Sequence, residues 1–229
     1  MDREELFEKY INECDKTPKY FCGQGNPNAD ILIIGQESTD TRESLVCDNI
    51  RLCRDKKERD APRPIDPKNK TWANYQILLD EIYNRKSDYP DKWDFEKYAF
   101  TSELSSIPRK QNNYSDAKSS IQNRLRFFEE SIFIQSFPVI ILACSNYIRN
   151  NHKNREIDNT FHVEFCQVYG SKENKNRFWT HFDDRNSPRK LVIHTRQFSL
   201  RYMNNEDKEW LIKEMASVIR DHLAKLGLK

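Results

Sequence analysis

The amino-acid sequence predicts an α/β fold, with a three-layer α/β/α arrangement around a mainly parallel central sheet. Short apolar runs at 31–34, 139–144 and 191–193 stand between turn residues, a pattern typical of strands buried on both faces. Longer segments with apolar residues at helical spacing separate these runs. Strands that alternate with helices pair in parallel, because each helix carries the chain back across the sheet. The pattern covers the whole chain without an internal repeat, so we expect one domain, residues 1–229.

The composition indicates a folded core under a strongly charged surface. Of the 229 residues, 37% are hydrophobic, 32% are charged and 12% are aromatic, and this many aromatic residues argues against disorder. The formal net charge of +2 is too small to indicate a polyanionic partner by itself. The amino terminus has no apolar signal segment, and no run approaches membrane-spanning length. We therefore expect a cytoplasmic protein without a membrane partner.

Six cysteines, at 14, 22, 47, 53, 144 and 166, form no Cys-x-x-Cys pair. Their spacing does not indicate a zinc site or an iron–sulfur cluster, and in a reducing cytosol free thiols are expected. Cys144 follows an apolar run, which predicts a small buried side chain. No metal and no other cofactor is expected.

The first third of the chain begins with a helix and a buried strand. Asp2 is placed to cap the helix, with Glu5 three residues later as in a capping box. Residues 22–28 are turn-forming types, and residues 31–34 form the first strand. Residues 38–70 are charged and punctuated by prolines, which predicts a long loop or lid instead of core.

The remaining elements continue the alternation of strands and helices. Thr71 is expected to cap a second helix, and Asn204 to open the last helix, which Gly227 closes. Between them the pattern predicts strands at 98–104 and 139–144, a helix at about 115–135, a polar segment at 145–159, paired strands at 161–168 and 178–182, and a last apolar strand at 191–194.

Two of the predicted strands end abruptly in polar residues capable of catalysis. Gly35, Gln36 and Glu37 follow the first strand, and His194 opens a polar stretch at the end of the last one. The ligand crevice of an open α/β sheet lies at the carboxyl ends of its parallel strands, so Glu37 and His194 are expected to flank one cleft. Each segment also has a purely structural interpretation, as a glycine turn with an exposed carboxylate and as a hydrogen-bonded core histidine.

Together the two segments resemble the uracil-DNA glycosylase superfamily. From residue 35 the chain reads Gly-Gln-Glu-Ser-Thr-Asp, where the best-known branch has the water-activating loop Gly-Gln-Asp-Pro-Tyr-His. From residue 194 it reads His-Thr-Arg-Gln-Phe-Ser, with Arg201 beyond, where the family has His-Pro-Ser-Pro-Leu-Ser and then an arginine. Residues 25–30 are also similar to the approach of bacterial members, and the order of elements agrees over nearly the whole chain. The resemblance implies a uracil-DNA glycosylase-like fold.

The resemblance also implies roles for individual residues. Glu37 takes the place of the water-activating aspartate, and His194 that of the histidine that stabilises the carbonyl oxygen of the leaving base. Breaking an N-glycosidic bond needs this pair of functions, because positive charge develops on the sugar and negative charge on the base. Phe198 stands where the family has a leucine wedge that fills the gap left by an extruded nucleotide, although packing under the final helix is the alternative. The expected DNA-binding residues are Arg196, Ser199 and Arg201.

The residues expected to contact the base come from both halves of the chain. Gly35 and Gln36 adjoin Glu37 in the first motif. Ser102 lies near the place of the family's base-reading asparagine, but a serine cannot make the bidentate amide contact. Its neighbour Glu103 either reads the base instead or faces solvent. The Pro-Tyr-His that walls the uracil pocket of the family is absent, so the base that is recognised stays open.

Basic residues gather in three places, at 51–63, 149–155 and 185–190. A DNA-facing surface requires such clusters, but the acidic residues between them fit an ordinary solvated surface equally well.

The sequence therefore predicts a DNA glycosylase-like hydrolase that flips out a base and cleaves its N-glycosidic bond, in base-excision repair or modified-base removal. DNA is the expected partner, and the chain is expected to act as a monomer. One alternative is a non-catalytic DNA-binding or base-sensing protein of the same fold. Another is an α/β/α hydrolase of a small molecule, for which the chain offers neither a Gly-x-Ser-x-Gly elbow nor a phosphate loop.

Overall fold

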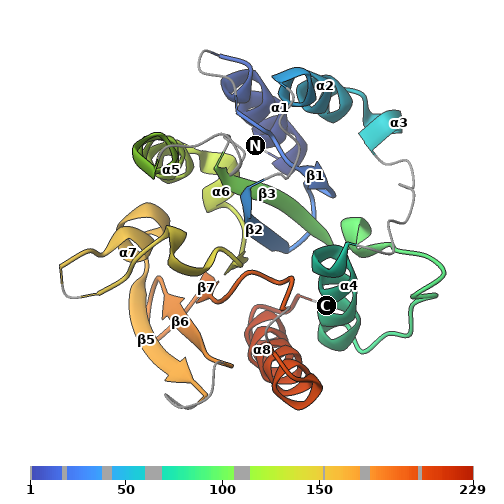
Figure 1. The fold of residues 1–229 in the computed structure, drawn as a ribbon, viewed down its shortest axis with the longest axis vertical. Helices are drawn as coiled ribbons and strands as arrows, with labels where there is room; N and C mark the ends of the chain where they lie inside the picture. Colours follow the sequence, from blue (N-terminus) through green and yellow to red (C-terminus); the bar gives the residue numbers. More distant parts are fainter. Residues whose placement is uncertain are drawn as a thin grey trace.

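The computed structural model describes residues 2–16, 20–37, 43–59, 69–105, 114–151, 153–170, 176–200 and 203–228. Within these ranges one seven-stranded sheet has the order β1-β3-β2-β4-β7-β6-β5, with β1 and β5 at opposite edges (Figure 1). The strands are β1 (Gln24–Gly25), β2 (Ile31–Glu37), β3 (Ala99–Ser105), β4 (Val139–Leu142), β5 (Glu164–Tyr169), β6 (Phe178–Phe182) and β7 (Leu191–His194). The helices are α1 (Arg3–Cys14), α2 (Glu43–Arg54), α3 (Lys56–Arg59), α4 (Lys70–Ile82), α5 (Tyr114–Glu130), α6 (Ile132–Gln135), α7 (Glu156–Phe161) and α8 (Asn205–Lys225), with 3₁₀ turns η1 (Phe95–Lys97) and η3 (Ser145–Tyr147).

The centre of the sheet is parallel and both edges are antiparallel. β2 pairs in parallel with β3 and β4, and β4 pairs in parallel with β7. β1, β6 and β5 join through antiparallel pairs. The predicted mainly parallel sheet is thus limited to the centre, because the short connections between β5, β6 and β7 allow hairpins but no crossover helix.

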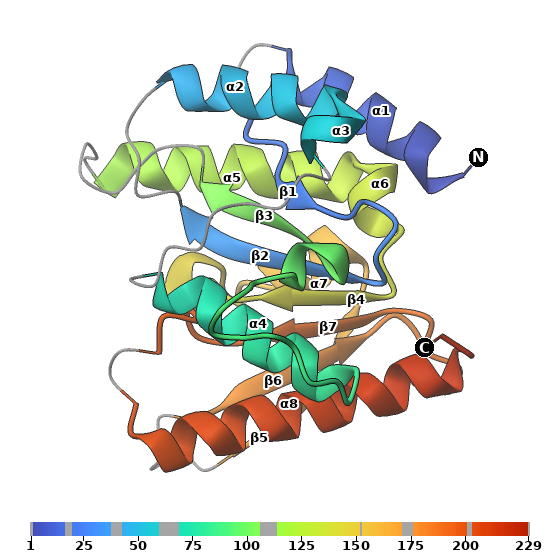
Figure 2. The same ribbon diagram turned by 90° about the vertical axis from the view of Figure 1, so that its right-hand side faces the viewer.

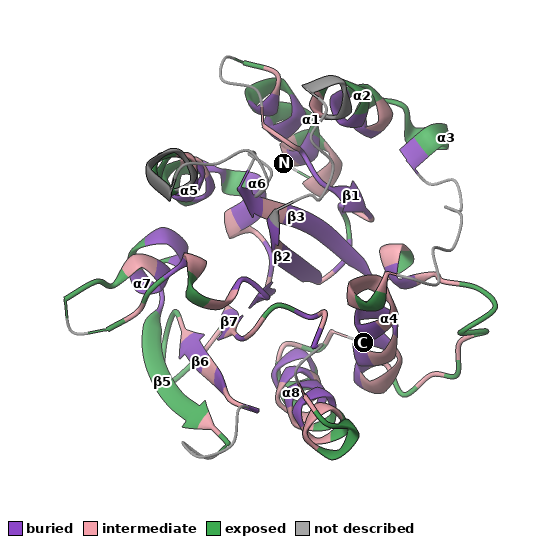
Figure 3. Ribbon diagram, viewed as in Figure 1, coloured by how far each residue is buried: buried purple, intermediate pink, exposed green. Residues whose placement is uncertain are grey.

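Helices cover both faces of the sheet and create three layers. On one face α1, α2, α5, α6 and α7 pack against strand residues that include Leu32, Ile34 and Val192. On the other face α4 and α8 pack against Ile31 and Ile33 (Figure 2). Successive strand residues point to opposite faces, so the continuous apolar runs supply both cores. Figure 3 shows the contrast between the buried central strands and the exposed edge strand β5.

Two helices stand where the sequence predicts a long loop. α2 and α3 lie within 38–70, and Ile50 and Cys53 of α2 are part of the core beside α1. A narrow apolar face is enough to hold a charged helix once a partner surface is present, so the loop prediction is wrong for 43–59. The rest of that segment, apart from the cap of α4, lies outside the described residues.

The helix ends confirm some predicted caps and correct others. The side chain of Asp2 accepts a hydrogen bond from the Glu5 backbone N–H at 2.9 Å, and Asn204 accepts one from the Asp207 N–H at 2.7 Å. α4 is capped by Asn69, not by Thr71. The predicted helix at 115–135 is broken at Ser131, which caps α6, and the polar segment 145–159 contains η3 and the start of α7.

The cysteines are free thiols, as predicted, and Cys144 is fully buried. Among the described residues no helix has both the length and the apolar character needed to cross a membrane.

Candidate functional site

The strands that carry Glu37 and His194 run in the same direction, so their carboxyl ends lie at the same end of the sheet. The register places Ile34, Leu142 and His194 side by side on β2, β4 and β7, with adjacent strands about 4.8 Å apart. Glu37 lies three residues beyond Ile34, and its backbone is opposite Ser105 of β3. The Glu37 backbone lies at the carboxyl end of the sheet that the sequence predicts, and its side chain lies outside the described part of the structure.

A cavity of about 490 Å³ lies where these strands end. Gln36 lines it from the first predicted segment, and His194, Thr195, Arg196 and Ser199 line it from the second. The turn η3 forms another wall, and Arg177 and Trp179 complete the described lining at β6, with Gln197, Leu200 and Met203. A volume of several hundred Å³ suits a small organic ligand. The two segments that the sequence singled out therefore share one cavity.

Gln36 is held by a hydrogen bond to the loop after β4. It is 7% exposed, and its Nε2 donates to the carbonyl oxygen of Cys144 at 3.2 Å. A carbonyl oxygen only accepts hydrogen bonds, so this contact determines which end of the amide is which. The other end, Oε1, is buried and has no hydrogen-bond partner in the part of the chain that the structure describes.

His194 is a neutral ring with its one N–H group occupied. Burial is the main cause that lowers its pKa to about 4. The hydrogen bond to Ser145 raises the pKa and the nearby His181 lowers it further. Its Nε2 lies 2.8 Å from the carbonyl oxygen of Ser145, so Nε2 carries the proton and Nδ1 is an acceptor. The ring lies against Trp179, with 5.4 Å between ring centroids. In this arrangement His194 accepts a hydrogen bond from a ligand, in contrast to the donor role that the resemblance implies.

The described lining of the cavity is cationic. It contains Arg177 and Arg196, and no carboxylate side chain is described among its wall residues. The guanidinium of Arg177 lies 5.8 Å from the centre of the Trp179 ring. Positive charge beside an aromatic ring favours an anionic ligand with a flat group, such as a nucleotide.

Ser102 lies away from this cavity, in a buried network around Arg124. Arg124 is fully buried, and its Nη2 donates to the Ser102 hydroxyl at 3.0 Å, the Tyr10 hydroxyl at 3.2 Å and the Phe21 carbonyl at 2.6 Å. Its Nε donates to the Glu103 carbonyl at 3.2 Å. The Ser102 hydroxyl also reaches the Cys22 carbonyl at 3.3 Å. Ser102 therefore satisfies a buried arginine, and its predicted contact with a base is not supported.

Phe198 is a core residue, so the prediction of a protruding wedge is wrong. Its side chain is 0% exposed, and its ring centroid lies 5.5 Å from that of Tyr75 on α4. Asn74 of α4 donates from Nδ2 to the Phe198 carbonyl at 2.5 Å. The loop after β7 turns back over the α4 and α8 layer, because burying the ring stabilises it more than exposure would.

The remaining predicted residues have different surroundings. A Cβ at Gly35 would meet the Tyr75 hydroxyl at 3.5 Å, which is ordinary contact. Glu103 is partly exposed and pairs with Gly35 across the β2–β3 register. Neither residue is among the described lining of the cavity. Arg201 lies outside the described residues.

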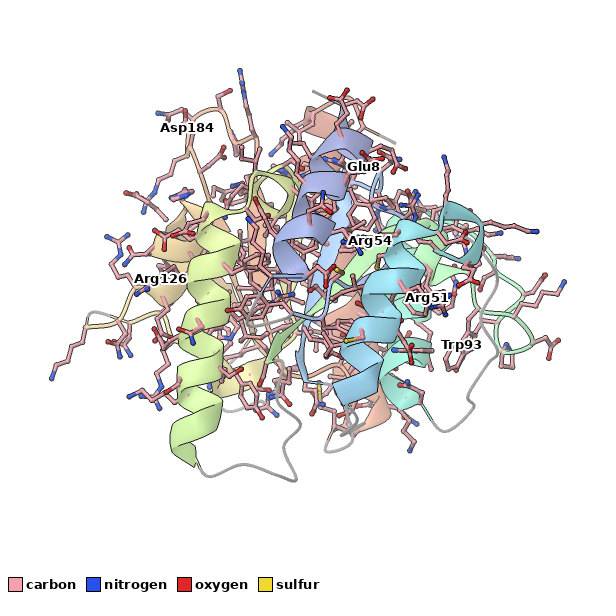
Figure 4. The ribbon with its side chains drawn as sticks, turned by 90° about the horizontal axis from the view of Figure 1, so that it is seen from above. Glu8, Arg51, Arg54, Trp93, Arg126 and Asp184 are labelled. Atoms are coloured by element: carbon pink, nitrogen blue, oxygen red, sulfur yellow. The ribbon has the colours of Figure 1, made fainter. Side chains whose placement is uncertain are left out.

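Part of the basic cluster at 51–63 pairs with the protein's own acidic residues. Arg51 lies 2.8 Å from Glu58, and Arg54 lies 2.8 Å from Asp15. Figure 4 shows Arg51 and Arg54 on α2. The nearly buried Arg59 reaches Glu4 at 3.2 Å. These contacts favour the interpretation as a solvated surface for Arg51 and Arg54, whereas Arg59 is buried.

The sequence interpretation missed several contributors to the site, among them Ser145, Arg177 and Trp179. Ser145 has a positive φ of 52°, and its hydroxyl accepts a hydrogen bond from the Gln197 N–H at 3.0 Å. Arg177 and Trp179 come from an antiparallel strand whose position beside β7 follows only from the sheet order. The one available signal was the polar residue directly after the apolar run that ends at Cys144.

No family model matches the chain, and a search of curated proteins found no match either. Among the described residues no group of three or more His, Cys, Asp or Glu side chains is arranged to hold a metal ion. The residues of the cavity therefore carry the evidence for function.

Proposed function

We propose that this protein is a DNA glycosylase-like hydrolase that takes a nucleobase into the cavity at the carboxyl ends of β2, β4 and β7 and cleaves its N-glycosidic bond. One observation carries the proposal. Two motifs meet at the carboxyl ends of the parallel strands, and both supply walls of one cavity. The motifs are Gly35–Glu37 and His194–Ser199, which more than 150 residues separate in the sequence.

The cationic lining supports a substrate with phosphate groups. Arg177 and Arg196 are partly exposed side chains of the cavity wall, and Trp179 offers an aromatic surface for a base. Stacking on an aromatic ring and contacts from arginine to phosphate are the usual means of holding a single nucleotide. Glu37 at the end of β2 is the candidate to orient water and stabilise positive charge on the sugar.

Base release from DNA tests the proposal. The purified protein is incubated with single- and double-stranded oligonucleotides that carry a panel of modified bases, and alkali-labile sites are counted. We expect release of at least one base, slowed about a hundredfold or more by Glu37→Gln, the usual scale for a positioned acid–base group. Glu164→Gln, on the exposed strand β5, is the matched control. Release at the parental rate by Glu37→Gln, or no release from any substrate, contradicts the hydrolase.

A base-binding protein without catalytic activity is the second candidate. The occupied N–H of His194 favours it, because that donor is then not directed at a leaving base. Salt-sensitive DNA binding without base release in the same assay supports this candidate over the first.

A further inference from the structure

The cavity contains polar atoms that the protein itself leaves unsatisfied. Gln36 Oε1 and Thr195 Oγ1 are buried and have no hydrogen-bond partner among the described residues. Both residues line the cavity, and they are 7% and 1% exposed. Buried polar atoms are nearly always paired in folded proteins. Two unpaired atoms on the wall of one cavity indicate a ligand that pairs with them.

The hydrogen bonds behind the wall determine what two of these side chains can offer. Gln36 donates from Nε2 to the Cys144 carbonyl, which leaves the amide oxygen as the unpaired end. His194 donates from Nε2 to the Ser145 carbonyl, which leaves Nδ1 without a proton. Because both carbonyls can only accept, neither side chain can turn around without losing its own hydrogen bond. Gln36 and His194 thus present two acceptors.

Thr195 does not oppose this polarity. A hydroxyl donates or accepts according to its partner, so Thr195 can serve either kind of ligand group. The choice between ligands therefore rests on Gln36 and His194.

We infer that the cavity prefers a nucleobase with an exocyclic amino group over one with a carbonyl oxygen at the same position. The inference deepens the proposed function and rests on it. An amino group carries two N–H groups and can donate to both acceptors, whereas a carbonyl oxygen at the same position donates to neither, and the ring N–H beside it can pair with at most one of them. A site built to accept a hydrogen bond rejects an isostere without the donor more strongly than an apolar pocket does. The preference therefore excludes uracil as the best ligand.

Two matched pairs of bases test the preference. Four single-stranded oligonucleotides are made with abasic residues throughout and one central base, which is cytosine, uracil, adenine or hypoxanthine. Within each pair, cytosine against uracil and adenine against hypoxanthine, the amino group is replaced by a carbonyl oxygen and the adjacent ring nitrogen gains a proton. Dissociation constants are measured by fluorescence anisotropy at one salt concentration. We expect the amino base to bind at least about tenfold more tightly in both pairs.

Variants of the wall assign the preference to its source. Gln36→Leu and His194→Phe each remove one acceptor, and each is expected to reduce the discrimination within both pairs. Thr195→Val removes the hydroxyl that serves either partner, so it should weaken both members of a pair alike and leave their ratio unchanged. Near-parental melting temperatures show which variants are folded, and the pairs of bases test the parent protein without any variant.

The possible results separate the inference from the proposed function. Equal or reversed affinities within either pair overturn the inference, while binding to all four oligonucleotides leaves the base-binding cavity standing. Absence of salt-sensitive binding to any of the four overturns both. Preference for the amino base in both pairs, lost in Gln36→Leu or His194→Phe but kept in Thr195→Val, supports the inference.

Discussion

Replacing Phe198 by alanine distinguishes a core side chain from a DNA-inserting one. The ring is completely buried against Tyr75, within the core cluster between the sheet and the α4 and α8 layer. Phe→Ala at such a site costs about 3–5 kcal/mol, from lost transfer free energy and from the cavity left behind. Against a total stability of roughly 5–15 kcal/mol, this is a large part of what holds the protein folded.

The expected loss is measurable by thermal and urea denaturation. In a protein of 229 residues, each kcal/mol lowers the melting temperature by roughly 2–4 °C, so Phe198→Ala should lower it by roughly 6–20 °C. Phe165→Ala is the matched control, because the same atoms are removed from an exposed ring on the edge strand β5, where 41% of the residue is accessible. Its effect should stay within about 1 kcal/mol.

The wedge hypothesis predicts the opposite behaviour. If Phe198 inserts into DNA, Phe198→Ala keeps the parental melting temperature and loses activity on duplex DNA far more than on single-stranded DNA. That combination for Phe198→Ala would refute the argument from burial, whereas a large loss of stability with equal effects on both DNA forms would support it.

Three further predictions concern charge and hydrogen bonding. Burial lowers the pKa of His194 to about 4 from an ordinary 6.5. The neutral ring therefore contributes roughly 3 kcal/mol to the free energy of unfolding above about pH 6.5, and this contribution is lost as the pH falls toward 4. Urea denaturation at several pH values should show a shallower pH dependence of stability in His194→Gln, and an unchanged dependence would contradict the shift. Arg124→Met leaves several buried acceptors unpaired and should lower the free energy of unfolding by more than about 2 kcal/mol. Arg126→Met, on the exposed side of the same helix, should change the stability little (Figure 4). Similar melting temperatures of the two variants would show that the network is not needed. Arg196→Gln should reduce the slope of log affinity against log salt by about 0.7–0.9, because one phosphate contact is lost. Lys57→Gln on α3 should leave this slope unchanged. Equal slopes for Arg196→Gln and the parent protein would place Arg196 outside the DNA contact.

The sequence determined the elements whose signals are local. The apolar runs at 31–34, 139–144 and 191–194 became β2, β4 and β7, because a strand buried on both faces needs uninterrupted apolar residues. Asp2 and Asn204 cap α1 and α8 through contacts three residues away. The polar residues at the strand ends also predicted the sheet edge at which Glu37 and His194 lie.

Only the tertiary structure decided features that depend on partners distant in the sequence. α2 is a helix because α1 and the sheet cover its few apolar residues, although the charges around them resemble those of a loop. Phe198 is buried because Tyr75 and Asn74 of α4 meet the loop after β7. These contacts join residues that are distant in the sequence, so no local sequence pattern could predict the burial of α2 or of Phe198.

The chemistry of the site divides in the same way. The sequence places a glutamine and a histidine at the ends of two strands, but each side chain can offer a donor or an acceptor. The carbonyl oxygens of Cys144 and Ser145, supplied by a third strand's loop between them, take the N–H groups of both. Hydrogen-bond polarity at the cavity is therefore a property of the packed sheet, because it is determined by which groups the fold places behind the wall.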